Sequence, residues 1–173
     1  MAQNRHHALD RLFAYWEETR GGRAVPALAD IDPTDIPWAL GQIWLCDRLE
    51  PGNRFRYRLA GETVNAYWGF SIAGKSLDEI VPPERLATVT EKFRMACELP
   101  AVVHDRVSLS LSEEIVRHGE RLILPLSQDG ARVDVLLGAE RANWDRALEF
   151  DPYVSCSETT TVTRAVPDQI EPR

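Results

Sequence analysis

The chain has 173 residues, enough for one domain with its own core, and its 44% hydrophobic and 27% charged residues are typical of a globular protein. A net charge of −7 argues against general binding to nucleic acids. No apolar run approaches the roughly 20 residues that a membrane helix needs, and the first residues lack the apolar core of a signal peptide, so we expect a cytoplasmic protein without membrane insertion.

The first predicted element is a helix over residues 6–20, which Gly21-Gly22 ends. One face of this helix carries four apolar side chains at the i, i+3, i+4 and i+7 spacing: Leu9, Leu12, Phe13 and Trp16. Because this stripe is too apolar to remain in water, it packs either on the outer face of the chain's own sheet or on a second subunit. The four residues are therefore candidates for an interface.

Residues 41–49 and 54–60 are predicted to form an antiparallel hairpin with a turn at 50–53. In the second strand the apolar side chains of Phe55, Tyr57 and Leu59 face one way. The opposite face carries Arg54, Arg56 and Arg58. This row of guanidiniums is a candidate anion site, and the alternative is pairing with acidic residues such as Asp47 or Asp134, or coverage by the leading helix with Glu17 and Glu18.

Short helical pieces follow over residues 61–81, where Ser76 and Glu79 have the spacing of a capping box. Pro82-Pro83 then opens a longer helix over residues 83–97. The inner face of that helix carries Leu86, Val89, Phe93 and Ala96. Three more strands are predicted at 101–111, 115–127 and 131–139, with a hairpin turn at 128–130. Beyond Trp144 the pattern is lost, which predicts a loosely held tail.

This order of elements predicts an α+β fold. One antiparallel sheet of five strands carries the short helices and the longer helix on one face, and a helix precedes it. We expect a leading helix and linker over residues 1–38 that act as a cap or a dimerisation element, a domain over 39–141, and a C-terminal extension over 142–173.

Three stretches resemble the PAS domain superfamily, and in particular a bacterial group of small stand-alone PAS proteins. Residues 54–84 resemble the second strand and short helices of that group: RFRYRLAGETVNAYWGFSIAGKSLDEIVPPE. Residues 119–139 are similar to its last hairpin: GERLILPLSQDGARVDVLLGA. The resemblance extends to the leading helix and linker over residues 12–37: LFAYWEETRGGRAVPALADIDPTDIP.

The resemblance implies a non-enzymatic sensory or regulatory module. PAS domains hold a small ligand between sheet and helices, or nothing, and commonly dimerise. We therefore expect a homodimer that contacts a separate signalling protein, because 173 residues leave no room for an output domain. The alternatives are a constitutive interaction adaptor with a filled core and, third, a small-molecule enzyme on a cavity-bearing α+β fold.

Apolar side chains from several elements are predicted to converge between the sheet and the helices: Tyr57, Val64, Trp68 and Phe93. They either fill the core or line a ligand cavity. Strand alternation places Asp105 on the same face as Val103 and Val107, and a buried carboxylate there needs a partner. A bulge would instead turn His104 inward. Tyr57, His104 and Asp105 are thus the candidate polar groups of the cavity.

The identity of a cofactor remains unknown from the sequence. Between Gly69 and Pro82 there is no cysteine in the helix motif of photoactive flavin PAS domains, and the helix over 83–97 has no histidine to ligate haem. The four histidines have no metal-site spacing. Cys46, Cys97 and Cys156 form no CxxC pair, so we expect reduced thiols. No catalytic residue is predicted, since the serines of 108–112 do not lie at a nucleophile elbow.

Overall fold

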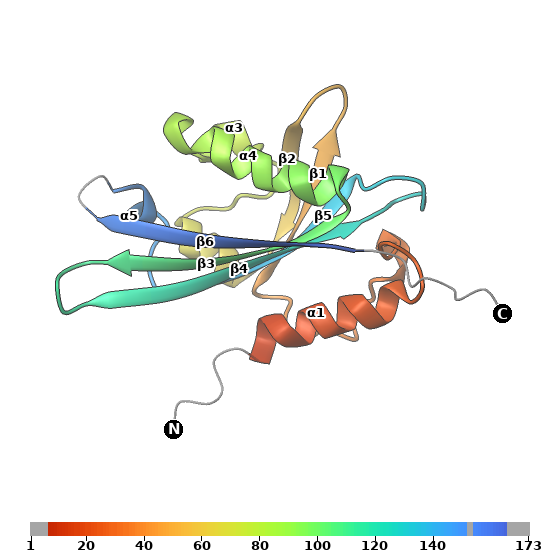
Figure 1. The fold of residues 1–173 in the computed structure, drawn as a ribbon, viewed down its shortest axis with the longest axis horizontal. Helices are drawn as coiled ribbons and strands as arrows, with labels where there is room; N and C mark the ends of the chain where they lie inside the picture. Colours follow the sequence, from red (N-terminus) through yellow and green to blue (C-terminus); the bar gives the residue numbers. More distant parts are fainter. Residues whose placement is uncertain (1–6, 152–153, 166–173) are drawn as a thin grey trace.

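Six antiparallel strands form one sheet in the computed structural model, which describes residues 7–151 and 154–165. The strands run across the sheet in the order β2 (Arg54–Ala60), β1 (Ile43–Leu49), β5 (Val135–Arg141), β4 (Val116–Leu126), β3 (Ala101–Ser110) and β6 (Ser155–Arg164). Figure 1 shows α1 (His7–Arg20) on one side of the sheet, with α3 (Leu77–Ile80) and α4 (Pro83–Glu98) on the other. We call these two sides the outer and the inner face.

The predicted hairpin and the predicted three-strand meander are both present, as β1–β2 and β3–β4–β5. The chain leaves β2 at Gly61, where an added Cβ would lie 2.3 Å from the carbonyl oxygen of Leu40. Only glycine fits such a close approach. Gly61 is also the N-cap residue of α2 (Glu62–Trp68), which begins directly after it. The capping box is confirmed, since the Ser76 backbone N–H donates to Glu79 at 2.7 Å.

The prediction of five strands was wrong, because residues 155–164 form β6, which pairs with β3 along its whole length. The expectation of a loosely held segment therefore fails for these residues. β6 lies at the edge of the sheet and is largely exposed, so it lacks the alternation of apolar and polar residues that marks a half-buried strand. Its run of threonines favours a strand only weakly. Residues 152–153 and 166–173 of the predicted tail lie outside the described residues.

The sheet separates two cores of different composition. On the outer face, α1 packs against β4 and β5 through an entirely apolar cluster that includes Leu12, Trp16, Leu124 and Leu137. The inner core is rich in aromatic side chains from β1, β2, α2 and α4. The indole of Trp44 lies directly over Gly138, where an added Cβ would be 2.0 Å from the ring, so this site requires glycine.

A β-bulge in β2 corrects one strand-face prediction. Leu45 pairs with Leu59 and Cys46 pairs with Tyr57, which leaves Arg58 as an extra residue between them. Phe55 and Tyr57 are buried on the inner face as predicted, whereas Leu59 is 39% exposed. The bulge reverses the alternation after Tyr57 and turns Leu59 away from the inner core.

Candidate functional site

A cavity of about 30 Å³ lies between the inner face of the sheet and the helices α4 and α5 (Ala147–Phe150), with room for roughly one or two water molecules. We call it the inner cavity. Its lining combines aromatic rings with four cationic and four anionic residues: Arg85, Lys92, Arg121, Arg146, Asp105, Glu140, Glu149 and Glu158. Seven polar or charged residues are buried in the described part of the chain, and five of them line this cavity.

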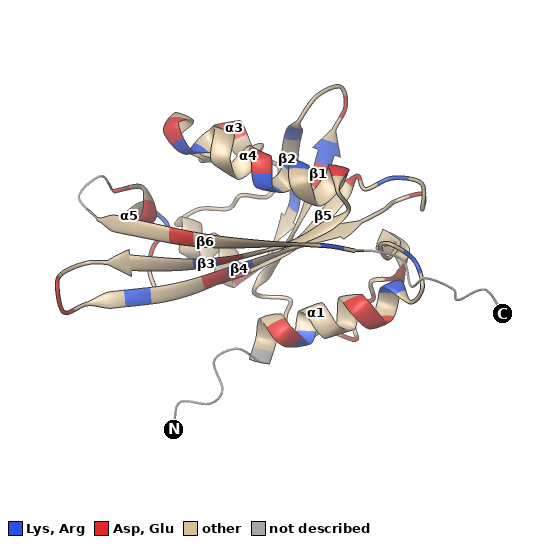
Figure 2. Cartoon of the chain, viewed as in Figure 1, with Lys and Arg blue, Asp and Glu red and all other residues tan. Residues whose placement is uncertain are grey.

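A row of polar residues crosses the inner face at one level of the sheet. Thr160 of β6 pairs in register with Asp105 of β3, and Asp105 pairs with Arg121 of β4. Arg121 is followed by Glu140 of β5. The Thr160 hydroxyl donates to Asp105 at 2.6 Å. Charges of opposite sign therefore alternate from strand to strand, an arrangement that stabilises neighbouring pairs. Figure 2 shows charged residues of both signs on β3, β4 and β6.

The long helix α4 places two cations over this row. Arg85 and Lys92 share one helix face with Val89, because they lie four and three residues from it. Lys92 Nζ is 2.9 Å from Asp105 and 2.7 Å from Glu158, and only 8% of Lys92 is exposed. This lysine therefore joins two carboxylates from β3 and β6 in a buried pair.

The segment after β5 brings a second charged group into the inner cavity. Arg146 lies over three aromatic rings, at 4.6 Å from Trp68, 5.2 Å from Phe150 and 5.5 Å from Tyr67. Glu149 forms an ion pair with Arg121 and accepts hydrogen bonds from the hydroxyl of Tyr67 and the indole of Trp144. The short helix α5 thus closes the cavity and is held there by its own charged side chains.

Burial changes the protonation of several groups in the inner cavity. It raises the pKa of Glu149 to about 8, with a further contribution from Glu158. It lowers the pKa of Arg146 to about 10, helped by the nearby Arg121. It also raises the pKa of Tyr57 well above its ordinary value. Burial therefore works against the ionised form of Glu149 that pairs with Arg121, while Arg146 keeps its charge near neutral pH.

Several buried polar atoms around the inner cavity have no hydrogen-bond partner among the described residues. They are Nε1 of Trp44, Nε1 of Trp68, Nε of Arg85, Nε of Arg146 and Oε2 of Glu140. Each unpartnered buried group costs about 1–3 kcal/mol. A core built for stability avoids this cost, and either ordered water or a bound molecule would satisfy these atoms.

Four of the six residues predicted to line a cavity do line the inner cavity. Tyr57, Trp68, Phe93 and Asp105 all line the inner cavity. Val64 is buried in the inner core but does not line the cavity. His104 lies on the outer face, 4.0 Å from Glu120, because β3 runs through this region without a bulge. His104 is therefore not a cavity residue, while Asp105 is buried and paired as its position required.

The candidate interface residues are largely used within the chain. Leu9, Leu12 and Trp16 are buried against the outer face of the chain's own sheet, which was one of the two arrangements considered. Trp16 also donates a hydrogen bond to Pro125 at 2.9 Å. These three residues therefore cannot form a subunit interface while α1 stays in place. Phe13 is 37% exposed and remains a candidate.

One of the three arginines of β2 pairs with an acidic residue, as the alternative to an anion site predicted. Arg58 makes two hydrogen bonds to the carboxylate of Asp47, at 2.6 and 3.1 Å. Arg54 and Arg56 are exposed on the same strand. One of the three guanidiniums is thus already engaged, which weakens the case for an anion site at this surface.

Most charged residues of the inner cavity were missed by the sequence reasoning. The signal existed for Lys92 and Arg85, which share the helix face of Val89, and for Arg121 and Glu140, which alternate with apolar residues of β4 and β5. These charges were not predicted because most positions on an inner face are apolar. Arg146, Glu149 and Glu158 lie in a segment without hydrophobic periodicity. No local sequence pattern therefore predicts that their side chains reach the inner cavity.

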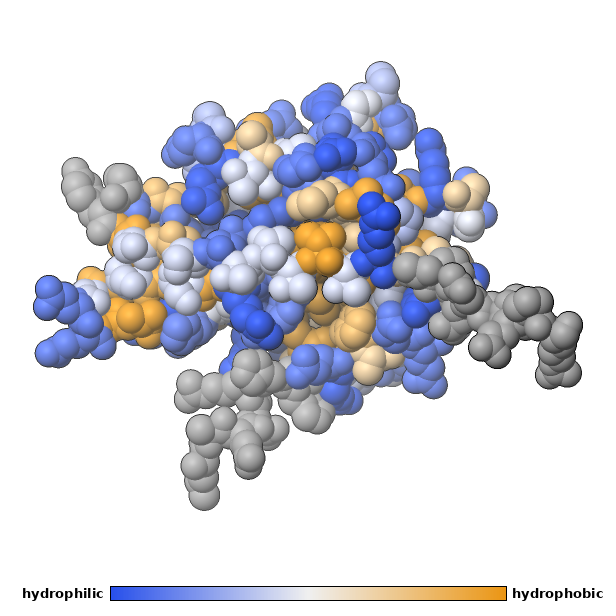
Figure 3. Space-filling model, viewed as in Figure 1, coloured by the Kyte–Doolittle hydropathy of each residue, from blue (hydrophilic) through white to orange (hydrophobic). Residues whose placement is uncertain are grey.

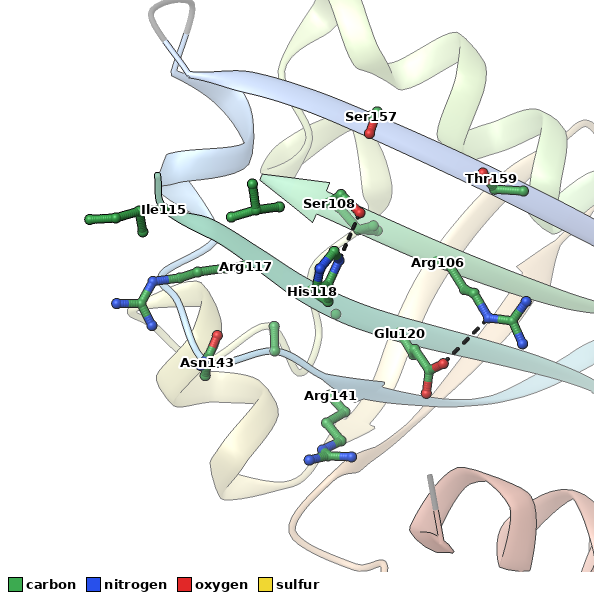
Figure 4. A pocket seen from close by; sticks show the side chains of 14 residues that line it. Arg106, Ser108, Ile115, Arg117, His118, Glu120, Arg141, Asn143, Ser157 and Thr159 are labelled. Carbon is green, nitrogen blue, oxygen red and sulfur yellow. Dashed lines mark hydrogen bonds and ion pairs between the residues drawn. The ribbon is translucent and has the colours of Figure 1, made fainter. Parts of the chain in front are cut away.

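A larger hollow of about 980 Å³ opens on the outer face, over the ends of β3 and β4 (Figure 4). Its side chains pair across the strands: Ser108 Oγ is 2.9 Å from His118 Nδ1, and Arg106 is 3.5 Å from Glu120. A serine next to a histidine is also used in nucleophilic catalysis. Here His118 is exposed and the two residues are register neighbours, which accounts for their contact without a catalytic role.

Neither a metal site nor a membrane-spanning helix is present in the described residues 7–151 and 154–165. No three histidine, cysteine or acidic side chains come together as a metal site there. No helix in this part of the chain has the length and apolar character to cross a membrane. Figure 3 shows a mostly hydrophilic surface on the face that it views, with apolar residues exposed in small groups.

Comparison with known proteins identifies the family. Residues 4–140, well over half of the chain, match a family model described as PAS domain. The chain belongs to the PAS domain family. The match includes the leading helix and ends before α5 and β6, so Arg146, Glu149 and Glu158 of this PAS domain lie beyond it. Membership of the family suggests a sensory or regulatory role.

Searches with the sequence and with the structure gave different results. No curated protein matches the sequence of this PAS domain. Among solved structures, the PAS domain of Bordetella pertussis BvgS matches with 18% sequence identity and a TM-score of 0.46, over 66% of this chain and 85% of the BvgS chain. A similarity at this level carries no conclusion about ligand or partner.

Proposed function

We propose that this PAS domain is a sensory module that binds a small ligand in the inner cavity and acts through contacts with a separate signalling protein. The observation that carries the proposal is the set of unpartnered buried donors on four residues that line a cavity together with charged groups: Trp44, Trp68, Arg85 and Arg146. Perturbed pKa values and convergent polar groups are typical of functional sites. The proposal includes a cytoplasmic location and a homodimer.

The strands offer a short route from the inner cavity to the outer face. Asp105 in the cavity lies between His104 and Arg106, which point to the outer face and contact Glu120 there. Arg121 likewise follows Glu120 along β4. A ligand that repositions the charged row would therefore shift side chains on the uncovered part of the outer face, where a protein contact is free to form.

A constitutive interaction adaptor with a filled core is the second candidate. It is favoured by the volume of the inner cavity, since about 30 Å³ holds water and little else without a movement of side chains. In that case ordered water molecules would satisfy the unpartnered groups, and ligand binding would play no part in the output.

Native mass spectrometry of the protein purified from its own host tests the proposal. The wild type is expected to carry a bound small molecule and to appear as a dimer, and Arg146→Met is expected to lose the small molecule. Arg11→Met is the matched control, because Arg11 also stacks on an indole, 4.1 Å from Trp38, but on the surface. A ligand-free monomer would contradict the proposal, and a ligand-free dimer would favour the adaptor.

A further inference from the structure

The unpartnered atoms of the inner cavity specify the chemistry of its occupant. Four of them are N–H donors, on Trp44, Trp68, Arg85 and Arg146, and one is an acceptor, Oε2 of Glu140. The excess of donors calls for a molecule rich in acceptor oxygens. Trp44 is 2% exposed, Trp68 7% and Arg146 6%, so bulk water does not satisfy these groups.

We propose that the inner cavity binds a small planar oxyanion with a single negative charge, of the size of formate, nitrate or bicarbonate. The inference rests on the proposed function, because it takes the inner cavity to be a ligand site, and it names the class of ligand.

The size of the inner cavity limits the occupant. A volume of about 30 Å³ corresponds to roughly one or two water molecules, which a three- or four-atom anion can replace with small adjustments of the lining. A nucleotide, a flavin or haem would require the removal of α5 and of the aromatic rings of Trp68 and Phe150 from the cavity.

The charges of the inner cavity favour a single negative charge. The lining holds four cationic and four anionic residues, so it is balanced when all are ionised. Burial raises the pKa of Glu149 to about 8, so uptake of one proton by Glu149 can accompany the binding of a monoanion and keep the lining balanced. Hydrogen bonds from a guanidinium to an oxyanion are among the stronger ones in proteins.

The unpartnered oxygen of Glu140 indicates which oxyanions fit the inner cavity best. Arg146 Nη1 lies 3.8 Å from this oxygen, too far for a hydrogen bond. An oxyanion that also carries a hydroxyl, such as bicarbonate, can donate to Glu140 while its other oxygens accept from the indoles. Nitrate has the same planar shape without the hydroxyl, so bicarbonate is expected to bind more tightly than nitrate.

Part of the site lies outside the region that the family model matches. Arg146 and Glu149 lie after residue 140, where the match to the family model ends, yet they supply the guanidinium and the titrating carboxyl of the inner cavity. The oxyanion site is therefore formed jointly by the family core and by the segment around α5.

The indole N–H signals of the protein test the inference directly by nuclear magnetic resonance. The chain has five tryptophans, and 15N labelling gives one indole signal for each. Sodium formate at millimolar concentration is expected to shift the signals of Trp44 and Trp68 with saturation. The signals of Trp16, which already donates to Pro125, and of Trp38, which is partly buried against the outer core, are expected to stay in place.

Sodium gluconate at the same ionic strength is the control, since this carboxylate is too large for the inner cavity. Equal shifts with gluconate, or no saturable shift with formate, bicarbonate or nitrate, would overturn the inference. Trp68→Phe keeps the ring and removes the donor, so it is expected to raise the formate dissociation constant about tenfold, whereas Trp38→Phe leaves it unchanged. Unchanged affinity in a folded Trp68→Phe protein would also count against the inference.

The two proposals fail in different ways. If native mass spectrometry finds a bound molecule of another class while the small anions leave the indole signals unchanged, the oxyanion inference is wrong and the ligand-binding function stands. If neither experiment finds a bound species, both are wrong.

Discussion

The two faces of the sheet differ in the polarity of the side chains that pack on them. On the outer face, α1 buries an apolar stripe on an apolar surface, and the indole of Trp16 has its hydrogen bond at 2.9 Å. On the inner face, aromatic rings surround a charged network in which five polar atoms have no hydrogen-bond partner within the part of the chain that the structure describes. The same strands serve both faces, because neighbouring residues such as Arg121 and Leu122 point in opposite directions.

This difference separates stability from function. Beneath α1, the outer face follows what stability alone would select, which is apolar contact. Elsewhere on this face, Nε2 of His104 is a buried atom without a hydrogen-bond partner among the described residues. The inner face keeps buried ion pairs, which contribute little net stability compared with apolar packing. Departures from such rules are expected at functional sites, so the contrast between the faces supports the proposed ligand site on the inner one.

Removing a large side chain from the outer face is expected to have the largest effect on stability. Trp16 is fully buried, so Trp16→Ala is expected to lower the free energy of unfolding by about 3–5 kcal/mol in a denaturant titration. Phe13→Ala on the same helix is the control and is expected to cost much less, since Phe13 is half-exposed. Equal losses from the two variants would show that α1 does not pack as described.

Breaking one buried ion pair on the inner face is expected to cost somewhat less. Lys92→Met leaves the carboxylates of Asp105 and Glu158 close together without their shared cation, at a cost of about 3 kcal/mol. Arg94→Met, on the exposed side of the same helix, removes pairs with Glu91 and Glu98 and is expected to change stability little. If Lys92→Met were as mild as Arg94→Met in denaturant unfolding, the inner network would have to be solvated.

The smallest expected effect is a pH dependence that only the inner face produces. Because the folded-state pKa of Glu149 is raised to about 8 from its ordinary 4.5, the folded chain holds an extra proton between these values. Its contribution to stability is therefore complete below the lower value and is lost as the pH rises through the higher one. We expect a loss of about 1 kcal/mol between about pH 7 and about pH 9.

Denaturant unfolding at several pH values measures this effect, and Glu149→Gln is expected to remove it. The groups that face Glu149 are the hydroxyl of Tyr67, the indole of Trp144 and the charged side chains of Arg121, Arg146 and Glu158. Glu91→Gln, at the surface, should leave the pH dependence as in the wild type. A pH dependence that survives Glu149→Gln would assign it to another group.

The sequence predicted the elements whose signals are local. Alternation and helical spacing placed the strands β1 to β5 and the inner position of Asp105 correctly, while the bulge at Arg58 and the edge strand β6 were missed. Pairing of β6 with β3 is a long-range contact, and a two-sided exposed strand carries no hydrophobic pattern that would reveal it.

The candidate site was predicted only in part, for a related reason. The aromatic walls, Tyr57, Trp68 and Phe93, follow from apolar periodicity. The charged lining depends on which side chains meet across the fold, as when Arg146 reaches Trp68 or Glu158 reaches Lys92. Such long-range contacts are determined by the tertiary structure, so no residue spacing in the sequence predicts them.

A high-resolution crystal structure of the protein purified from its own host tests the central claim most directly. The account predicts electron density for a small planar molecule in the inner cavity, at hydrogen-bond distance from the indole nitrogens of Trp44 and Trp68 and from the guanidinium of Arg146. Water molecules alone, or an empty cavity closed by its own side chains, would contradict it.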